Sequence, residues 1–235
     1  MQNWYPNDKE ELEELIEKYF KAKVKKKTNK EIHGLIVPHA GYEFSGPIAG
    51  KAFSLLRNKE INKAIVIGPT HYVGFYGVRA INNVESALGK VNLIKNNYPK
   101  LTYEHSVDNQ IPFLQKLNPE IQILPLVVGE ISEDEAENIV NELSKINAVF
   151  IFSTDLSHFL EYNKAKIVDK ETIKVIENLD INNFEKIDAC GKFPLRIMMQ
   201  LCKLKGWKPE LIEYKNSGDV IKDKSKVVGY CSFYF

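Results

Sequence analysis

The chain has 235 residues, 44% of them hydrophobic, and a formal net charge of +1 at pH 7. This length suits one large domain, and no stretch reaches the roughly 18 to 20 consecutive apolar residues of a membrane-spanning helix. A net charge near zero gives no general attraction to nucleic acid. The basic run from Lys21 to Lys30 has no interleaved aromatic residues, so we interpret it as a solvated turn.

The cysteine content and the first residues bear on the compartment. Cys190, Cys202 and Cys231 are an odd number without close pairing, which fits a reducing environment better than a disulfide framework. The segment Met1 to Pro6 lacks the basic-then-apolar order of a signal peptide. We therefore expect a cytoplasmic protein that binds neither membranes nor nucleic acid.

Helix and strand patterns alternate along the chain. In chain order we expect a helix over 8–22, a strand over 35–37, a helix over 46–57, a strand over 63–68, loops and minor strands over 71–110, a strand over 121–128, a helix over 132–145, a strand over 148–153, helices over 162–178 and 191–205, and strands over 210–214 and 226–235. This alternation predicts an α/β single-domain sandwich with a largely parallel central sheet flanked by helices. The two closing strands are expected to pair antiparallel at an edge.

Three of the predicted strands lead directly into titratable side chains. His39 follows the strand that stops at Pro38, and His71 follows the strand that stops at Gly68 and Pro69. The strand over 148–153 leads into Asp155 and His158. Because ligands of α/β sheets bind outside the carboxyl ends of the strands, these side chains predict one shared site.

Metal binding is the chemistry that this pattern favours. A lone loop histidine is usually only a polar loop residue, but His39 and His71 repeat the same context, and neutral imidazole is a common ligand for iron, copper and zinc. The ion also needs an anionic ligand, for which we consider Glu43, Asp108, Asp155 and Cys190. Cys190 lies next to the start of a predicted helix, where the helix dipole favours a thiolate. Cys202 and Cys231 fit small buried core residues instead.

Two further histidines are candidates for acid–base chemistry. Asp155 could orient His158 as a general acid or base, although Asp155 or Ser157 could equally cap a short helix. His105 is flanked by acids that could tune it or merely share a solvated surface with it. His33 lies at the beginning of a strand, which is the wrong end for this site.

Taken together, these segments resemble the Memo family, also called AmmeMemoRadiSam system protein B. The resemblance rests on five motifs in order, which span nearly the whole chain: Val37-Pro38-His39-Ala40-Gly41-Tyr42, Gly68-Pro69-Thr70-His71, Glu104-His105-Ser106, Ser153-Thr154-Asp155-Leu156-Ser157-His158 and Ala189-Cys190-Gly191. The family's fold is similar to that of class III extradiol dioxygenases, which bind Fe(II) with two histidines and a carboxylate. The resemblance therefore implies a fold of this type.

The resemblance also implies roles for individual residues. It points to His39, His71 and Cys190 as the metal-facing set, and to Asp155, His158 and His105 as residues that line the pocket. The implied cofactor is a divalent metal, with iron first and copper or zinc as alternatives. A thiolate in place of the carboxylate is a softer ligand, so dioxygenase activity does not carry over with the fold. Prokaryotic members are associated with radical-SAM and AMMECR-type proteins.

Two functions of different classes follow. In the first, the protein is a metal-dependent redox enzyme that acts on oxygen or an unknown small molecule, with His158 as acid or base. In the second, it is a non-catalytic module that binds a peptide or protein in the former active-site cleft. The enzyme hypothesis predicts that metal uptake and turnover are lost together in a His39→Ala variant, whereas the module hypothesis predicts partner binding in the presence of a chelator.

Overall fold

The computed structural model of the protein describes residues 4–24 and 30–235. Residues 1–3 of the segment Met1 to Pro6 lie outside the described residues, and so do residues 25–29 of the basic run from Lys21 to Lys30. The interpretation of that run as a solvated turn therefore stays a prediction.

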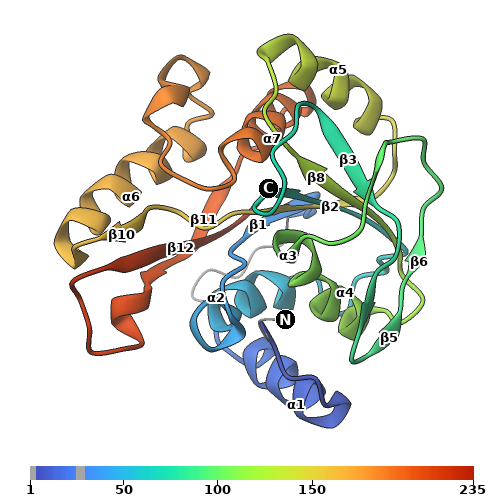
Figure 1. Ribbon diagram of the computed structural model, residues 1–235, viewed down its shortest axis with the longest axis horizontal. Helices are drawn as coiled ribbons and strands as arrows, with labels where there is room; N and C mark the ends of the chain where they lie inside the picture. The colour runs from blue at the N-terminus through green and yellow to red at the C-terminus, as the bar shows by residue number, and fades with distance from the viewer. Residues whose placement is uncertain (1–3, 25–29) are drawn as a thin grey trace.

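A single large sheet runs through the middle of the molecule (Figure 1). Its strands in spatial order are β10 (His158–Leu160), β12 (Val227–Tyr234), β1 (Gly34–Val37), β9 (Val149–Ser153), β2 (Lys63–Pro69), β8 (Gln122–Val128), β3 (Val78–Ile81) and β7 (Lys100–Leu101). Strand β11 (Glu210–Asn216) pairs with β12, and β6 (Asn92–Leu93) pairs with β8. Strands β4 (Glu85–Ser86) and β5 (Gly89–Lys90) form a separate hairpin.

The centre of the sheet is parallel, as the alternation of helices and strands predicts. Strand β9 pairs in parallel with β1 on one side and with β2 on the other, and β2 pairs in parallel with β8. Strand β12 is antiparallel to β1, and β11 is antiparallel to β12, so the expected antiparallel closing pair is confirmed. The carboxyl ends of β1, β2 and β9 therefore lie side by side.

Helices cover both faces of the sheet (Figure 1). They are α1 (Lys9–Phe20), α2 (Tyr42–Ser54), α3 (His105–Asp108), α4 (Ile111–Leu117), α5 (Glu133–Leu143), α6 (Tyr162–Glu177) and α7 (Lys192–Lys205), with short 3-10 turns at Ile181–Lys186 and Ser217–Asp219. Alternate residues of β9 serve opposite cores: Phe150 and Phe152 pack with α5, α6 and α7, whereas Val149 and Ile151 pack with α1, α2 and α4. Burial on both faces explains why the central strands are continuously apolar.

The structure differs from the sequence-based elements mainly around the site. Helix α2 begins at Tyr42 rather than at residue 46. The sequence pattern places the start too late because Gly46 and Pro47, which are typical helix breakers, lie within its first turns. Residues 71–110 were expected to hold only loops and minor strands, but they end in α3, which carries His105. Helix α4 and strand β10 also have no counterpart among the expected elements.

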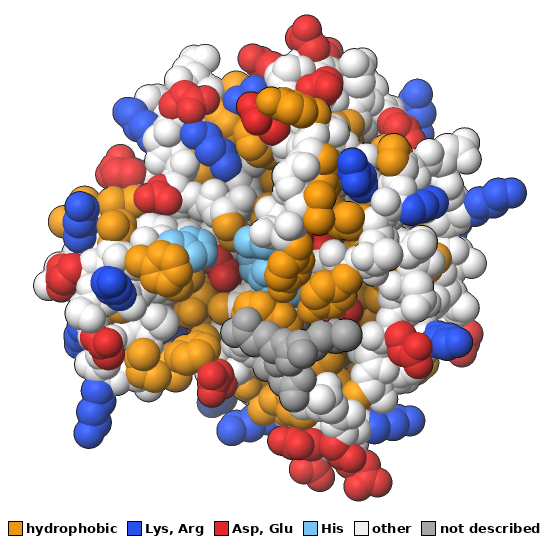
Figure 2. Space-filling view, viewed as in Figure 1, with side chains coloured by type: hydrophobic (Ala, Val, Ile, Leu, Met, Phe, Trp, Pro, Cys, Tyr) orange, Lys and Arg blue, Asp and Glu red, His pale blue; other side chains and the backbone are white. Residues whose placement is uncertain are grey.

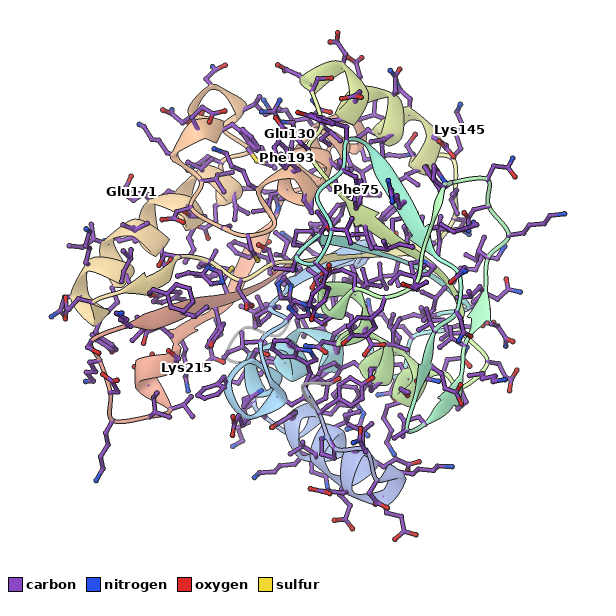
Figure 3. All side chains as sticks on the ribbon, in the orientation of Figure 1. Phe75, Glu130, Lys145, Glu171, Phe193 and Lys215 are labelled. Carbon is purple, nitrogen blue, oxygen red and sulfur yellow. The ribbon has the colours of Figure 1, made fainter. Side chains whose placement is uncertain are left out.

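The loop that follows β2 is fastened to the loop that follows β8. The backbone N–H of Glu130 donates to the carbonyl of Phe75, and the N–H of Gly77 donates to the carbonyl of Glu130. The Arg79 guanidinium lies 4.5 Å from the centroid of the Phe75 ring. Figure 3 shows Phe75 and Glu130 close together on these two loops. These contacts anchor the loop that carries His71.

Among the described residues, no helix combines the length and the apolar character needed to cross a membrane.

Helix α5 provides a test of how its sequence fixes its start. Ser132 Oγ accepts from the N–H of Glu135, and the Glu135 carboxylate accepts from the N–H of Ser132. We expect Ser132→Ala to lower the free energy of unfolding by about 0.5–2 kcal/mol in urea titrations, because an N-terminal donor loses its partner. Ser144→Ala, at the other end of the same helix, is the matched control and should have little effect. Equal losses in the two variants would contradict this account.

Candidate metal centre

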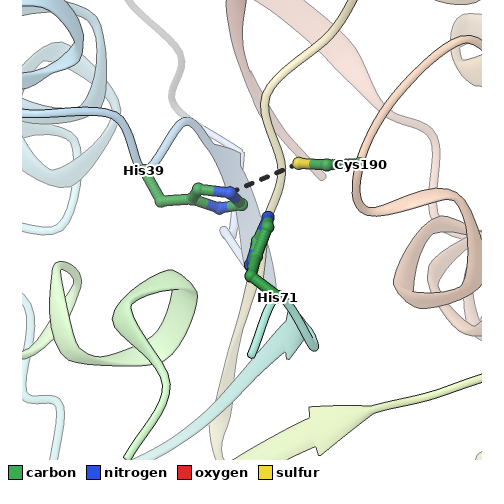
Figure 4. Close-up of side chains that lie close together, drawn as sticks. All are labelled: His39, His71 and Cys190. Carbon is green, nitrogen blue, oxygen red and sulfur yellow. Dashed lines mark hydrogen bonds between the residues drawn. The ribbon is translucent and has the colours of Figure 1, made fainter. Parts of the chain in front are cut away.

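The three residues that the sequence analysis names as metal ligands meet at the carboxyl edge of the sheet. His39 follows β1, His71 follows β2, and Cys190 precedes α7. One potential ligand atom from each lies within 4.8 Å of the other two, and His39 Nε2 is 3.3 Å from Cys190 Sγ. Figure 4 shows the two imidazoles and the thiol around one space. Two imidazoles and a thiol in this arrangement could hold a transition-metal ion.

The loop after β9 ties two of these residues together. Asp155 Oδ1 accepts from the backbone N–H of His39 at 2.8 Å. The backbone N–H of Asp155 donates to Cys190 Sγ at 3.2 Å, and the N–H of Cys190 donates to the Asp155 carbonyl. The next N–H, of Gly191, donates to Thr154 Oγ1 at 2.9 Å. The positions of His39 and Cys190 are therefore set by one short segment.

The ring of His39 is held by neutral partners. Its Nδ1 lies 2.8 Å from Ser153 Oγ, which also accepts from Gln110 Nε2 at 3.0 Å. Burial lowers the pKa of His39 well below its usual value, and the nearby histidines lower it further. His39 is therefore neutral, which is the form of imidazole that binds metals.

The ring of His71 is held by a carboxylate. Glu104 is fully buried, and its Oε1 lies 3.0 Å from His71 Nδ1, while its Oε2 accepts from the backbone N–H of His71 at 2.7 Å. Burial alone would raise the pKa of Glu104, but the close approach of the His105 ring and the hydrogen bonds from His71 outweigh it and hold that pKa well below its usual range. Glu104 is therefore an ionised acceptor in the interior of the site.

His105 is buried beside this carboxylate rather than on a solvated surface. Its Nδ1 lies 3.0 Å from Glu104 Oε1, and its ring centroid is 4.4 Å from that of His71. The Trp4 indole stacks on its other face at 4.3 Å with an interplanar angle of 9°. The alternative that His105 and its acidic neighbours merely share a solvated surface is therefore wrong.

Exposed aromatic side chains lie beside the histidines of the site. Tyr72 and Tyr103 are exposed, with ring centroids 5.8 Å apart, and Tyr72 also contacts the edge of His105. Phe159, which follows His158, is exposed with a positive φ of 59°. Figure 2 shows histidine side chains near the middle of this face, with hydrophobic side chains around them. A ligand on this face can therefore contact aromatic as well as polar groups.

The expectation about the Cys190 thiol needs a correction. The sequence predicts that the dipole of the following helix favours the thiolate. Instead, burial raises the pKa of Cys190, and the charge of Asp155 raises it further, against the smaller effect of the N–H groups of Asp155 and Gly191. Without a metal, Cys190 is therefore a protonated thiol.

The structure removes one interpretation of the Asp155 and His158 pair. No helix begins at residues 155–157; the chain passes instead into β10 at His158, so the capping alternative for Asp155 and Ser157 is wrong. His158 is half-buried, and the hydrogen bond that Asp155 Oδ1 accepts comes from His39. A role of His158 as acid or base, oriented by Asp155, stays a prediction.

The other candidates lie outside the group. Glu43 is exposed in the first turn of α2, and Asp108 accepts a hydrogen bond from the Tyr5 hydroxyl at 2.8 Å. His33 stacks on Trp207 at a centroid distance of 4.3 Å. Cys202 and Cys231 are buried and free, as expected of core residues. Among the four anionic candidates, only Cys190 joins the two histidines as a ligand group.

Several residues of the site are not predicted from the sequence, namely Trp4, Glu104, Ser153 and Gln110. Glu104 had a signal, because it stands in the Glu104-His105-Ser106 motif, but it was considered only as a neighbour of His105. Ser153 also stands in a quoted motif, directly before the loop. Trp4 and Gln110 had no signal, because their roles depend on contacts with residues far away in the sequence.

Comparison with known proteins identifies the relatives of the chain. Residues 2–234 match the model of a family described as Memo-like protein. The chain belongs to the Memo family. A MEMO1 family protein of Nitrosopumilus maritimus is 32% identical, with 99% of this chain and 96% of the relative aligned. Another, of Methanococcoides burtonii, is 34% identical, with 87% and 86% aligned.

The Memo family match spans the described structure from Trp4 to the end of β12. A third relative, a MEMO1 family protein of Sulfolobus acidocaldarius, is 33% identical over 85% of this chain. The predicted family resemblance is therefore confirmed over the segments that supply His39, His71 and Cys190.

Gly191 offers a test of the packing beside Cys190. A Cβ at this position would lie 2.5 Å from Thr154 Oγ1 and 3.0 Å from the Ser153 carbonyl. We expect Gly191→Ala to lower the free energy of unfolding by about 1–3 kcal/mol in urea titrations, because the added methyl group overpacks this contact. The control is Gly41→Ala, whose Cβ would meet only the Trp4 carbonyl at 3.8 Å. A Gly191→Ala variant as stable as that control would contradict the packing described here.

Proposed function

We propose that this protein is a metal-dependent redox enzyme in which His39, His71 and Cys190 bind iron or, as the alternative, copper. Zinc is the other ion that these ligands could hold, but it has no redox chemistry of its own. The observation that carries the proposal is the convergence of two imidazoles and a thiol within 4.8 Å of one another. In a tetrahedral nitrogen and sulfur site the ligand atoms are about 3.4–3.7 Å apart, and the 3.3 Å between His39 Nε2 and Cys190 Sγ is close to this spacing.

The chain's own groups support chemistry at this position. An iron or copper ion bound here would supply Lewis acidity and one-electron chemistry. Cys190 releases its proton on binding, and neutral His39 offers Nε2 as ligand. His158 is half-buried near the group and is our candidate for moving a proton, because an imidazole ring can both donate and accept a proton. His105 lies beside His71, with its Nδ1 next to the Glu104 carboxylate.

A second candidate function is a binding module, favoured by the exposed aromatic side chains beside the site. Tyr72, Tyr103 and Phe159 could contact a peptide or a protein surface without any turnover. In that case, partner binding should survive removal of the metal by a chelator. For either function we propose a cytoplasmic location, which the three free cysteines support.

Metal content is the direct test of the proposed function. We expect the anaerobically purified protein to carry close to one equivalent of iron or copper, or to bind it when supplied. A His39→Ala, His71→Ala, Cys190→Ser triple variant should lose this ion, because all three ligands are removed. His33→Ala is the control, since this histidine stacks on Trp207 away from the group. Equal metal content in the wild type and the triple variant would contradict the proposal.

The pH dependence of metal affinity provides a further prediction. Because burial raises the pKa of Cys190, the thiol is protonated at neutral pH, and the ion must displace that proton. We expect the affinity for Zn²⁺ to rise about tenfold per pH unit between pH 6 and 8, measured by competition with a chelator of known affinity. Cys190→Ser should be weaker and should lose most of this slope. A wild-type affinity independent of pH would argue against a thiolate ligand.

A further inference from the structure

The Glu104 carboxylate lies beside the candidate metal centre and accepts three hydrogen bonds. Its side chain is fully buried, and both ion-pair contacts recorded for it among the described residues are to histidines, His71 and His105. Its two oxygens accept from the backbone N–H groups of His71 and Ser106 at 2.7 and 3.2 Å. Its Oε1 also lies 3.0 Å from His71 Nδ1. One carboxylate therefore contacts both the backbone and the ring of a proposed ligand.

The bond between Glu104 and the His71 ring fixes where the imidazole carries its proton. Each oxygen of the Glu104 carboxyl group already accepts a backbone N–H, from His71 and from Ser106, so the group faces donors and Nδ1 of His71 is the donor in this pair. In the neutral imidazole, Nε2 then keeps its lone pair. Metal-bound histidines commonly donate their second N–H to a carboxylate in this way, which orients the ring and strengthens the ligand.

His39 and His71 differ in the group that lies next to Nδ1 of each ring. His39 Nδ1 faces the Ser153 hydroxyl, a neutral group that can either donate or accept. His71 is also more exposed than His39, with 27% of its side chain accessible, so packing holds it less firmly. His71, which is less tightly packed, is thus paired with a charged carboxylate, whereas His39 is paired with a neutral hydroxyl.

Helix capping alone does not account for Glu104. It is the N-cap residue of α3 and accepts from Ser106 N–H, but this bond, at 3.2 Å, is the longest of its three hydrogen bonds. Ser, Thr, Asp and Asn are the favoured N-cap residues, because a short side chain suffices for that bond. The longer side chain of glutamate is what brings the carboxylate to His71.

We propose that Glu104 is the positioning residue of this site: it holds His71 as the Nδ1–H tautomer, so that Nε2 is free to bind the ion with His39 and Cys190. This inference rests on the proposed function for the ion, whereas the tautomer itself is a property of the metal-free protein.

The decisive experiment measures the His71 tautomer in the metal-free protein by long-range ¹H–¹⁵N spectra of the labelled imidazoles. The wild type should give the Nδ1–H tautomer for His71, assigned by comparison with His71→Asn. In Glu104→Asp, which keeps the charge and the cap, the carboxylate is drawn back from His71, and we expect a mixture of tautomers. A wild-type His71 in the Nε2–H form would overturn the proposal, whether or not any variant folds.

Metal affinity is the second readout. We expect Glu104→Asp and Glu104→Gln to bind Zn²⁺ or Co²⁺ about 10–100-fold more weakly than the wild type, with altered Co²⁺ absorption bands. Asp108→Asn removes another carboxylate of the same helix, one bonded to Tyr5, and should stay within about threefold of the wild type. Thermal unfolding verifies that each variant folds.

The outcomes separate this inference from the proposed function. If the wild type binds metal and Glu104→Asp keeps both its affinity and its tautomer, the positioning role is wrong and the metal site stands. If the wild type binds no metal but His71 is Nδ1–H and becomes mixed in Glu104→Asp, the proposed function fails while the positioning of His71 holds.

Discussion

The arrangement of the site depends on the loop that follows β9. Asp155 receives the backbone N–H of His39 on its carboxylate and the N–H of Cys190 on its carbonyl, and its own N–H donates to the Cys190 sulfur. Three segments that are more than 30 residues apart in the chain are thereby joined at one residue. Because Asp155 is buried, these hydrogen bonds have no competition from water. Parallel pairing of β9 with β1 and β2 brings the remaining ligand, His71, to the same edge.

The central strands and the positions of His39 and His71 could be predicted from the sequence, for a physical reason. Strands buried on both faces read as apolar runs, and such runs end visibly at Pro38 and Pro69, so the positions of His39 and His71 follow from the pattern. The start of helix α5 can also be predicted from the sequence, because Ser132 and Glu135 form a local capping box. These features depend on residues close together in the chain.

The rest depends on long-range contacts that no local pattern records. Glu104 precedes a helix of four residues, too short for a helical period to reveal, and its importance comes from His71, 33 residues away. The pKa of Cys190 was expected to follow the helix dipole, but burial and the charge of Asp155 outweigh that effect. Strand β10 has three residues and pairs with the first residues of β12, Val227 and Val228. Tertiary contacts decide each of these cases.

The central claim is that two imidazoles and one thiolate bind a single ion. X-ray absorption spectroscopy of the protein loaded with one equivalent of Zn²⁺ tests it most directly. We predict one sulfur at about 2.3 Å from the zinc together with nitrogen ligands at about 2.0–2.1 Å. A spectrum with only nitrogen and oxygen neighbours, or the absence of stoichiometric metal binding, would contradict it.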